Sequence, residues 1–133
     1  MKIYLDENLS EYVAEALNLL SKGYFPNIEV LSTKKAFGRG VADEDLIPII
    51  GKEGSILITQ DFNIKRRSSQ FDLCREYGLS VFFLVMQKNQ TRHWEIVKTL
   101  IEHWEDITLK AQKEAKPFAY MVRAIGKMKQ LDY

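Results

Sequence analysis

The chain has 133 residues, of which 46% are hydrophobic and 28% are charged, and its formal net charge is +1. This length can bury one substantial core but not two, so we expect a single domain over residues 1–133. The charge is unevenly spread, because residues 1–109 hold 13 basic and 16 acidic side chains, whereas residues 110–133 hold 6 and 2. An acidic body is therefore followed by a basic C-terminal segment, residues 110–133, which is either a solvated tail or an arm that contacts a polyanion.

The cellular compartment is indicated by what the sequence lacks. Cys74 is the only cysteine, which excludes an internal disulfide and favours a reducing compartment. The sequence shows neither an N-terminal signal nor an apolar run of membrane-spanning length. We expect a soluble, cytoplasmic protein.

The first third of the chain predicts a strand, a helix and a second strand. Residues 2–5 form the first strand, and residues 28–31 form the second. The helix between them, over about residues 9–22, begins at the cap residue Asn8 and ends before Gly23. Its apolar face comprises Leu9, Val13, Ala16, Leu17 and Leu20. This pattern is typical of a parallel βαβ unit.

The middle of the chain predicts a loop, a helix and a buried central strand. Residues 33–41 form the loop, and the glycines beside Arg39 let its backbone approach a ligand closely. The next helix has Asp43 as its cap and Glu44 and Asp45 in its first turn. A run of four apolar or near-apolar residues, 55–58, followed by Thr59-Gln60-Asp61, predicts a strand covered on both faces.

The rest of the chain continues the alternation of helices and strands. Residues 64–69 form a basic turn, followed by a helix over about residues 68–77, a buried strand over residues 79–85, a long helix from residue 91, and a last strand near residues 117–122. The long helix has a core-facing stripe of Trp94, Val97, Leu100, Ile101, Trp104 and Ile107. We therefore predict an α/β fold with a mainly parallel sheet and helices on both faces.

Three acids lie where this topology places functional groups. Asp6 follows the first strand, Asp43 begins a helix and Asp61 follows the central strand. Ligands of parallel sheets bind beyond the carboxyl ends of the strands, so these carboxylates can meet there. Oxygen ligands select Mg²⁺ or Mn²⁺ over softer metals. The alternative is that the acids are ordinary turn and cap residues.

The sequence resembles the PIN-like domain family, close to the VapC-type toxin ribonucleases of bacterial toxin–antitoxin systems. Three motifs carry the resemblance: Leu5-Asp6-Glu7-Asn8-Leu9, Val41-Ala42-Asp43-Glu44-Asp45-Leu46-Ile47, and Ile56-Leu57-Ile58-Thr59-Gln60-Asp61-Phe62. The resemblance implies a three-layer α/β/α fold and endonucleolytic cleavage of RNA with Mg²⁺ or Mn²⁺. It also implies inhibition by a small antitoxin protein, which we expect to bind DNA.

The resemblance assigns roles to individual residues of this sequence. Asp6, Asp43 and Asp61 would be the catalytic, metal-binding acids, and Thr59 and Asn8 would support the site. The fuller family pattern has one more acid, on a helix that the segment between Asp6 and Asp43 is too short to contain. Candidates to replace this acid are Glu7, Glu11, Glu44 and Asp45.

We therefore expect a metal-dependent endoribonuclease whose metal-activated water attacks the phosphodiester. Lys65, Arg66, Arg67 and Arg39 are the candidate RNA-binding residues. Two alternatives remain open: a non-catalytic nucleic-acid-binding protein on the same fold, and a small-molecule phosphohydrolase with a closed pocket. A homodimer is also compatible with the sequence.

Overall fold

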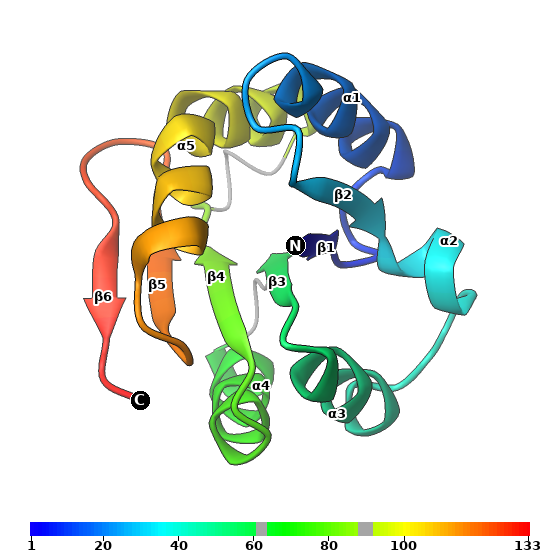
Figure 1. The fold of residues 1–133 in the computed structure, drawn as a ribbon. Helices are drawn as coiled ribbons and strands as arrows, with labels where there is room; N and C mark the ends of the chain where they lie inside the picture. The colour runs from blue at the N-terminus through cyan, green and yellow to red at the C-terminus, as the bar shows by residue number, and fades with distance from the viewer. Residues whose placement is uncertain (61–63, 88–91) are drawn as a thin grey trace.

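The structure, a computed structural model, describes residues 1–60, 64–87 and 92–133, and their side chains except those of residues 64–67. It is a three-layer α/β/α fold in which α1 and α5 cover one face of a central sheet and α3 and α4 cover the other (Figure 1). In chain order the elements are β1 (Lys2–Leu5), α1 (Glu11–Lys22), β2 (Glu29–Ser32), α2 (Thr33–Phe37), α3 (Asp43–Glu53), β3 (Ile56–Gln60), α4 (Ile64–Glu76), β4 (Ser80–Leu84), α5 (His93–Lys113), β5 (Ala119–Val122) and β6 (Lys129–Leu131).

The sheet has the strand order β2-β1-β3-β4-β5-β6, and only β6 runs antiparallel to its neighbour. The strand β3 lies between β1 and β4, with Leu5 opposite Ile58 and Gln60 opposite Leu84. Because β1 and β3 are parallel neighbours, both end at the same edge of the sheet. The predicted parallel architecture and the central place of β3 are confirmed.

Both faces of the middle strands are buried because their sequences are apolar in succession. Every residue of β3 and of β4 is buried. Alternate side chains point to opposite faces, so Ile56 and Ile58 join the core beneath α1 and α5, while Leu57 joins the core beneath α3 and α4. The sheet therefore separates two hydrophobic cores.

Four predictions about element boundaries are wrong. The cap of α1 is Ser10, whose Oγ accepts from the backbone N–H of Tyr12 (3.2 Å), and not Asn8. Residues 33–37 form the short helix α2 within the predicted loop. The N-cap of α3 is Ala42, so Asp43 is the first helical residue rather than the cap. Finally, α4 begins at Ile64, which places the predicted basic turn within the helix.

Two predicted apolar stripes extend further than the buried surface. On α1, Val13 and Leu17 are buried, but Ala16 is exposed and Leu20 is 63% exposed. On α5, Leu100, Trp104 and Ile107 are buried, whereas Trp94 is 66% and Ile101 is 56% exposed. The two helices thus leave part of their apolar surface uncovered.

The C-terminal region contributes the last two strands. The predicted strand over residues 117–122 corresponds to β5, which pairs with β4 in parallel. The strand β6, with the polar sequence Lys129-Gln130-Leu131, was not predicted because its sequence carries no apolar alternation. Among the described residues, no helix is both long and apolar enough to cross a membrane.

Candidate active site

Asp6 is held in place where the chain leaves β1. The residue is only 5% exposed, and its backbone N–H donates to the carbonyl oxygen of Ile58 (2.9 Å). Its carboxylate accepts hydrogen bonds from Thr59 Oγ1 to Oδ2 (2.7 Å) and from the N–H of Glu7 to Oδ1 (2.8 Å). Both carboxylate oxygens therefore have fixed positions.

The direction of Asp6 follows from the alternation of side chains along the strands. Tyr4 and Leu57 both belong to the core beneath α3 and α4. Asp6 and Thr59 lie two residues further along β1 and β3, so they emerge on the same side of the sheet. The carboxylate of Asp6 thus lies at the carboxyl edge, on the side covered by α3 and α4.

Asp43 is the first residue of α3. Its Oδ2 accepts a hydrogen bond from Nε2 of Gln70 on α4 (3.1 Å). Gln70 is 3% exposed, and its Oε1 is buried without a hydrogen-bond partner in the described part of the chain. A buried, unsatisfied amide oxygen costs about 1–3 kcal/mol and is commonly explained by a water, an ion or a ligand. Gln70 Oε1 lies beside the Asp43 carboxylate, because the nitrogen of the same amide group donates to that carboxylate.

The segment that precedes α3 is attached to the end of β1. Oε2 of Glu7 accepts a hydrogen bond from the backbone N–H of Gly40 (3.1 Å). Gly40 has a φ of +73°, a conformation that other residues rarely adopt. This contact joins the residue after Asp6 to the loop that leads into Asp43, and it leaves Arg39 exposed in that loop.

The apolar core lies directly behind Asp43. Burial, together with a smaller effect of the nearby negative charge of Asp43, raises the pKa of the Cys74 thiol to about 12, against the lowering effect of a hydrogen bond with Tyr133. Cys74 is fully buried on α4, four residues after Gln70. The Asp43 carboxylate therefore lies between a core that disfavours charge and the open edge of the sheet.

The other predicted site residues lie either on the surface or outside the described residues. Asn8, Glu44 and Asp45 are exposed, the last two in the first turn of α3. Asp61 lies outside the described residues, as do the side chains of Lys65, Arg66 and Arg67. The described contacts therefore concern Asp6 with Thr59, Asp43 with Gln70, and Glu7 with Gly40.

The donor atoms at this edge fit a hard divalent cation. Among the described side chains, no group of three or more His, Cys, Asp or Glu residues could hold a metal ion. The site does offer the carboxylates of Asp6 and Asp43 and the unsatisfied amide oxygen of Gln70, all of them oxygen donors. Magnesium and manganese ions bind such donors and usually keep several waters, so they do not need a cage of protein ligands.

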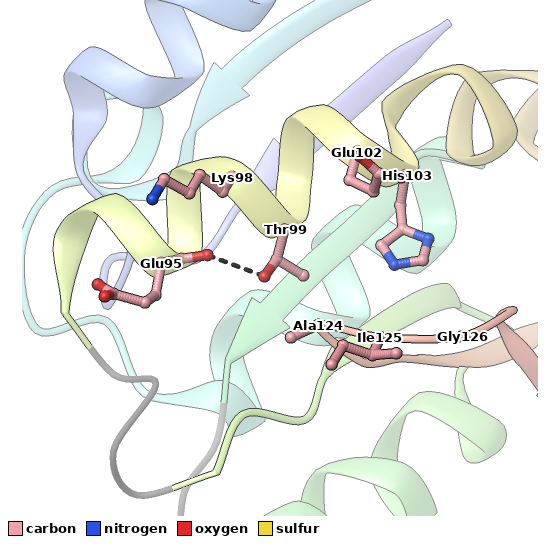
Figure 2. A pocket seen from close by; sticks show the side chains of 8 residues that line it. All are labelled: Glu95, Lys98, Thr99, Glu102, His103, Ala124, Ile125 and Gly126. Carbon is pink, nitrogen blue, oxygen red and sulfur yellow. Dashed lines mark hydrogen bonds between the residues drawn. The ribbon is translucent and has the colours of Figure 1, made fainter.

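A separate pocket of about 440 Å³ lies between α5 and the segment after β5 (Figure 2). Its wall carries the oppositely charged side chains of Lys98 and Glu102. Its histidine, His103, is already engaged, because Nε2 lies 2.7 Å from the carbonyl oxygen of Arg123. Neither Asp6 nor Asp43 lines this pocket. The pocket is therefore separate from the candidate site at the carboxyl edge of β1 and β3.

Sequence reasoning did not identify Gln70. It lies within α4, whose charged and polar sequence gives no clear apolar face, and an isolated glutamine there reads as a surface residue. Gln70 becomes recognisable as a site residue only once α3 and α4 are known to pack together, because it then lies beside Asp43. That packing cannot be read from one sequence.

The comparisons with known proteins identify the family. The family model for the PIN-like domain matches residues 1–86, which include β1 to β4 and the positions of Asp6, Asp43 and Gln70. No curated protein and no solved structure matched the chain. The matched region is more than half of the chain, and the strand order and three layers agree with it. The chain belongs to the PIN-like domain family.

Proposed function

We propose that this protein is a metal-dependent endoribonuclease. PIN-like domains are commonly nucleases and generally use divalent metal ions. The observation that carries the proposal is the pair of carboxylates at the carboxyl edge, Asp6 fixed by Thr59 and Asp43 fixed by Gln70. Two carboxylates that share a site with an unsatisfied amide oxygen would suit a cation, because without one they repel each other.

In this proposal each residue has a defined task. Asp6 and Asp43 bind the cation, together with Asp61, which follows β3 in the sequence. Thr59 orients Asp6 through its hydroxyl group, and Gln70 orients Asp43 through its amide nitrogen. When bound, Mg²⁺ or Mn²⁺ supplies an activated water and stabilises negative charge on the phosphoryl oxygens.

The RNA backbone would be held by basic side chains around the same edge. Arg39 is exposed in the loop that Glu7 fixes beside the end of β1. Lys65, Arg66 and Arg67 fall in the first turn of α4, next in sequence to the end of β3. Contacts of this kind bind phosphates regardless of sequence and weaken with salt.

RNA cleavage by the purified protein tests the proposal. With Mg²⁺ or Mn²⁺ the wild type should cleave RNAs from a broad cellular pool, and chelation should stop cleavage. Asp6→Asn and Asp43→Asn should each lower the rate by about 100-fold or more, because each removes a group that stabilises the transition state through the cation. Both variants should keep their RNA affinity, since neither loses a phosphate contact.

The matched control is Asp72→Asn, which removes the same charge from an exposed position on α4. It should cleave RNA at the wild-type rate. A wild type that binds RNA but shows no metal-dependent cleavage would favour a non-catalytic RNA-binding protein on this fold. Hydrolysis of small phosphate esters without RNA cleavage would favour a phosphohydrolase.

We further propose that the nuclease is the toxin of a toxin–antitoxin pair, on the basis of its resemblance to VapC-type proteins. The predicted partner is a small antitoxin that binds DNA. Expression should arrest growth, and coexpression of the neighbouring short reading frame should restore it. Growth arrest that persists in the Asp6→Asn variant would contradict a toxic nuclease activity.

A further inference from the structure

One helical layer of the protein exposes an unusual amount of apolar surface. Six large apolar side chains on α1, α5 and the turn after α1 are 56–80% exposed: Tyr12, Leu19, Leu20, Tyr24, Trp94 and Ile101. We call this surface the α1–α5 face. It lies on the side of the sheet opposite α3 and α4 (Figure 1).

The α1–α5 face is shaped as a ridge between two grooves. A groove of about 200 Å³ runs between Tyr12 and Trp94, and another of about 420 Å³ lies beside Tyr24 and Glu105. Leu20 and Ile101 line both grooves, so they form the ridge that separates them. Shape of this kind suits a partner with an apolar surface of its own.

The exposed area approaches what a stable protein interface needs. Tyr12, Tyr24 and Trp94 are 71%, 80% and 66% exposed, which amounts to about 300–550 Å² for aromatic side chains of this size. The three aliphatic side chains add to this. A single contiguous apolar patch of 300–600 Å² is already the largest on a typical monomer, and standard interfaces bury about 800 Å² from each partner.

The charges along α5 indicate which partner fits. Trp94, Lys98, Ile101 and Glu105 are all exposed and are spaced by four, three and four residues, so they form one stripe along the helix. Lys98 and Glu105 thus flank Ile101 with opposite charges at nearly equal distances. A stripe of this pattern is complementary to itself when two copies run antiparallel.

We propose that the α1–α5 face is a two-fold interface between two copies of this chain. The symmetry axis passes near Ile101, so the two α5 helices run antiparallel and the Ile101 side chains pack against each other. Lys98 of each copy then lies opposite Glu105 of the other. The Trp94 end of one copy faces the Tyr24 end of its mate, which covers the exposed aromatic side chains.

This arrangement leaves the candidate active site accessible. Asp6 and Thr59 emerge on the side of the sheet covered by α3 and α4, whereas the interface uses the opposite layer. The dimer therefore carries two carboxyl edges that both remain open to RNA. The inference does not depend on the proposed nuclease activity, since it concerns a different surface.

Sedimentation equilibrium over a range of protein concentrations tests the interface. The wild type should be a dimer, and Ile101→Glu should be a monomer, because it buries two like charges at the axis. Ile49→Glu is the matched control, since Ile49 is 47% exposed on α3 in the other layer. It should remain a dimer. Circular dichroism of each variant establishes that it is folded.

Charge exchange identifies the occupant as a second copy. Lys98→Glu and Glu105→Lys, each alone, should weaken dimerisation by about tenfold or more, because each places like charges opposite one another. The double variant Lys98→Glu/Glu105→Lys restores the pairing and should dimerise nearly as tightly as the wild type. A monomeric wild type, or a dimer that Ile101→Glu and the single reversals leave intact, would overturn the proposal.

Discussion

Two uncharged side chains, Thr59 and Gln70, fix the positions of the Asp6 and Asp43 carboxylates. Thr59 is fully buried at the end of β3 and donates to Asp6, and Gln70 donates to Asp43 from the buried side of α4. Loss of a group that orients a metal ligand in this way typically lowers metal affinity by about 10- to 100-fold. At the scale of single residues, the site is thus a set of pairs, each with one acid and one neutral donor.

Replacing Thr59 by valine tests the first pair. Thr59→Val keeps the shape of the side chain but removes a hydrogen bond to the buried, charged carboxylate of Asp6, so the free energy of unfolding should fall by about 1.5–3 kcal/mol. Denaturant titration measures this change. The control Thr108→Val removes an equally buried hydroxyl that donates to uncharged backbone carbonyls of its own helix, those of Trp104 and Glu105, and it should cost clearly less. Equal costs would show that Asp6 does not depend on Thr59.

Replacing Gln70 by methionine tests the second pair. Gln70→Met removes both the donor to Asp43 and the unsatisfied oxygen while keeping a similar volume. The affinity for Mn²⁺, measured by the rise in melting temperature with added metal, should fall by about 10- to 100-fold. Gln112→Met changes an exposed glutamine of α5 and should leave the affinity unchanged. An unaltered Mn²⁺ response in Gln70→Met would remove Gln70 from the site.

At the scale of elements, α3 and α4 determine whether Asp43 and Gln70 meet. Gly51 of α3 lies so close to the turn that ends α4 that a Cβ atom there would be 2.7 Å from the carbonyl oxygen of Tyr77. Alanine normally stabilises a helix relative to glycine. At this position the clash with backbone atoms should outweigh that gain, because α3 and α4 would have to separate.

Paired alanine substitutions measure this packing. Gly51→Ala should lower the free energy of unfolding by about 1–3 kcal/mol, as expected for overpacking. At Gly23 a Cβ would lie 3.7 Å from its nearest neighbour and φ is −70°. Gly23→Ala should therefore be neutral or slightly stabilising. Thermal unfolding of the two variants compares them directly, and equal behaviour would contradict the close approach of α3 to α4.

The strands were more predictable from the sequence than the helices. The sequences of β1, β3 and β4 contain short, nearly continuous apolar runs. Runs of this length are typical of strands that are buried on both faces of a sheet. The helical stripes were extended too far, because periodicity shows which face is apolar but not whether anything covers it. Trp94 and Ile101 follow the core pattern of α5 and yet remain exposed. The strand β6 depends on pairing with β5, a distant contact that its own sequence does not encode.

The site was predictable only in part, for a related reason. Topology placed Asp6 at the carboxyl edge, because a strand end followed by an acid is visible in the sequence. The partners of the acids depend on packing between separate elements, so neither Gln70 nor Gly40 could be identified beforehand. The mistaken assignment of Asp43 as a cap has the same origin, since an acid at a helix start usually caps that helix.

At the scale of the whole molecule, buried acidic groups make the fold sensitive to alkaline pH. Burial raises the pKa of Cys74 from 9.0 to about 12. Burial and the Glu53 carboxylate, which accepts a hydrogen bond from the phenol, raise the pKa of Tyr4 from 10.0 to about 12. Both groups hold their protons more strongly in the folded protein, so their contribution to stability is complete below about pH 9 and is lost as the pH rises towards 12.

The Cys74→Ala variant isolates the thiol's share of this effect. Its free energy of unfolding should decline less steeply between pH 9 and pH 12 than that of the wild type. Well below pH 9 the difference between the two proteins should be constant, because the thiol is then protonated in both the folded and the unfolded state. Chemical denaturation at a series of pH values measures both slopes. Parallel curves across the alkaline range would show that Cys74 does not titrate differently in the folded and unfolded states.

Calorimetric titration of the purified protein with Mn²⁺ tests most directly whether the acids form one cation site. The wild type should bind Mn²⁺, and Asp6→Asn, Asp43→Asn and Asp61→Asn should each lose most of the affinity, because each removes an oxygen ligand and a negative charge. Asp72→Asn should bind as the wild type does. Absence of binding to the wild type at millimolar Mn²⁺, or binding that survives all three substitutions, would contradict the site.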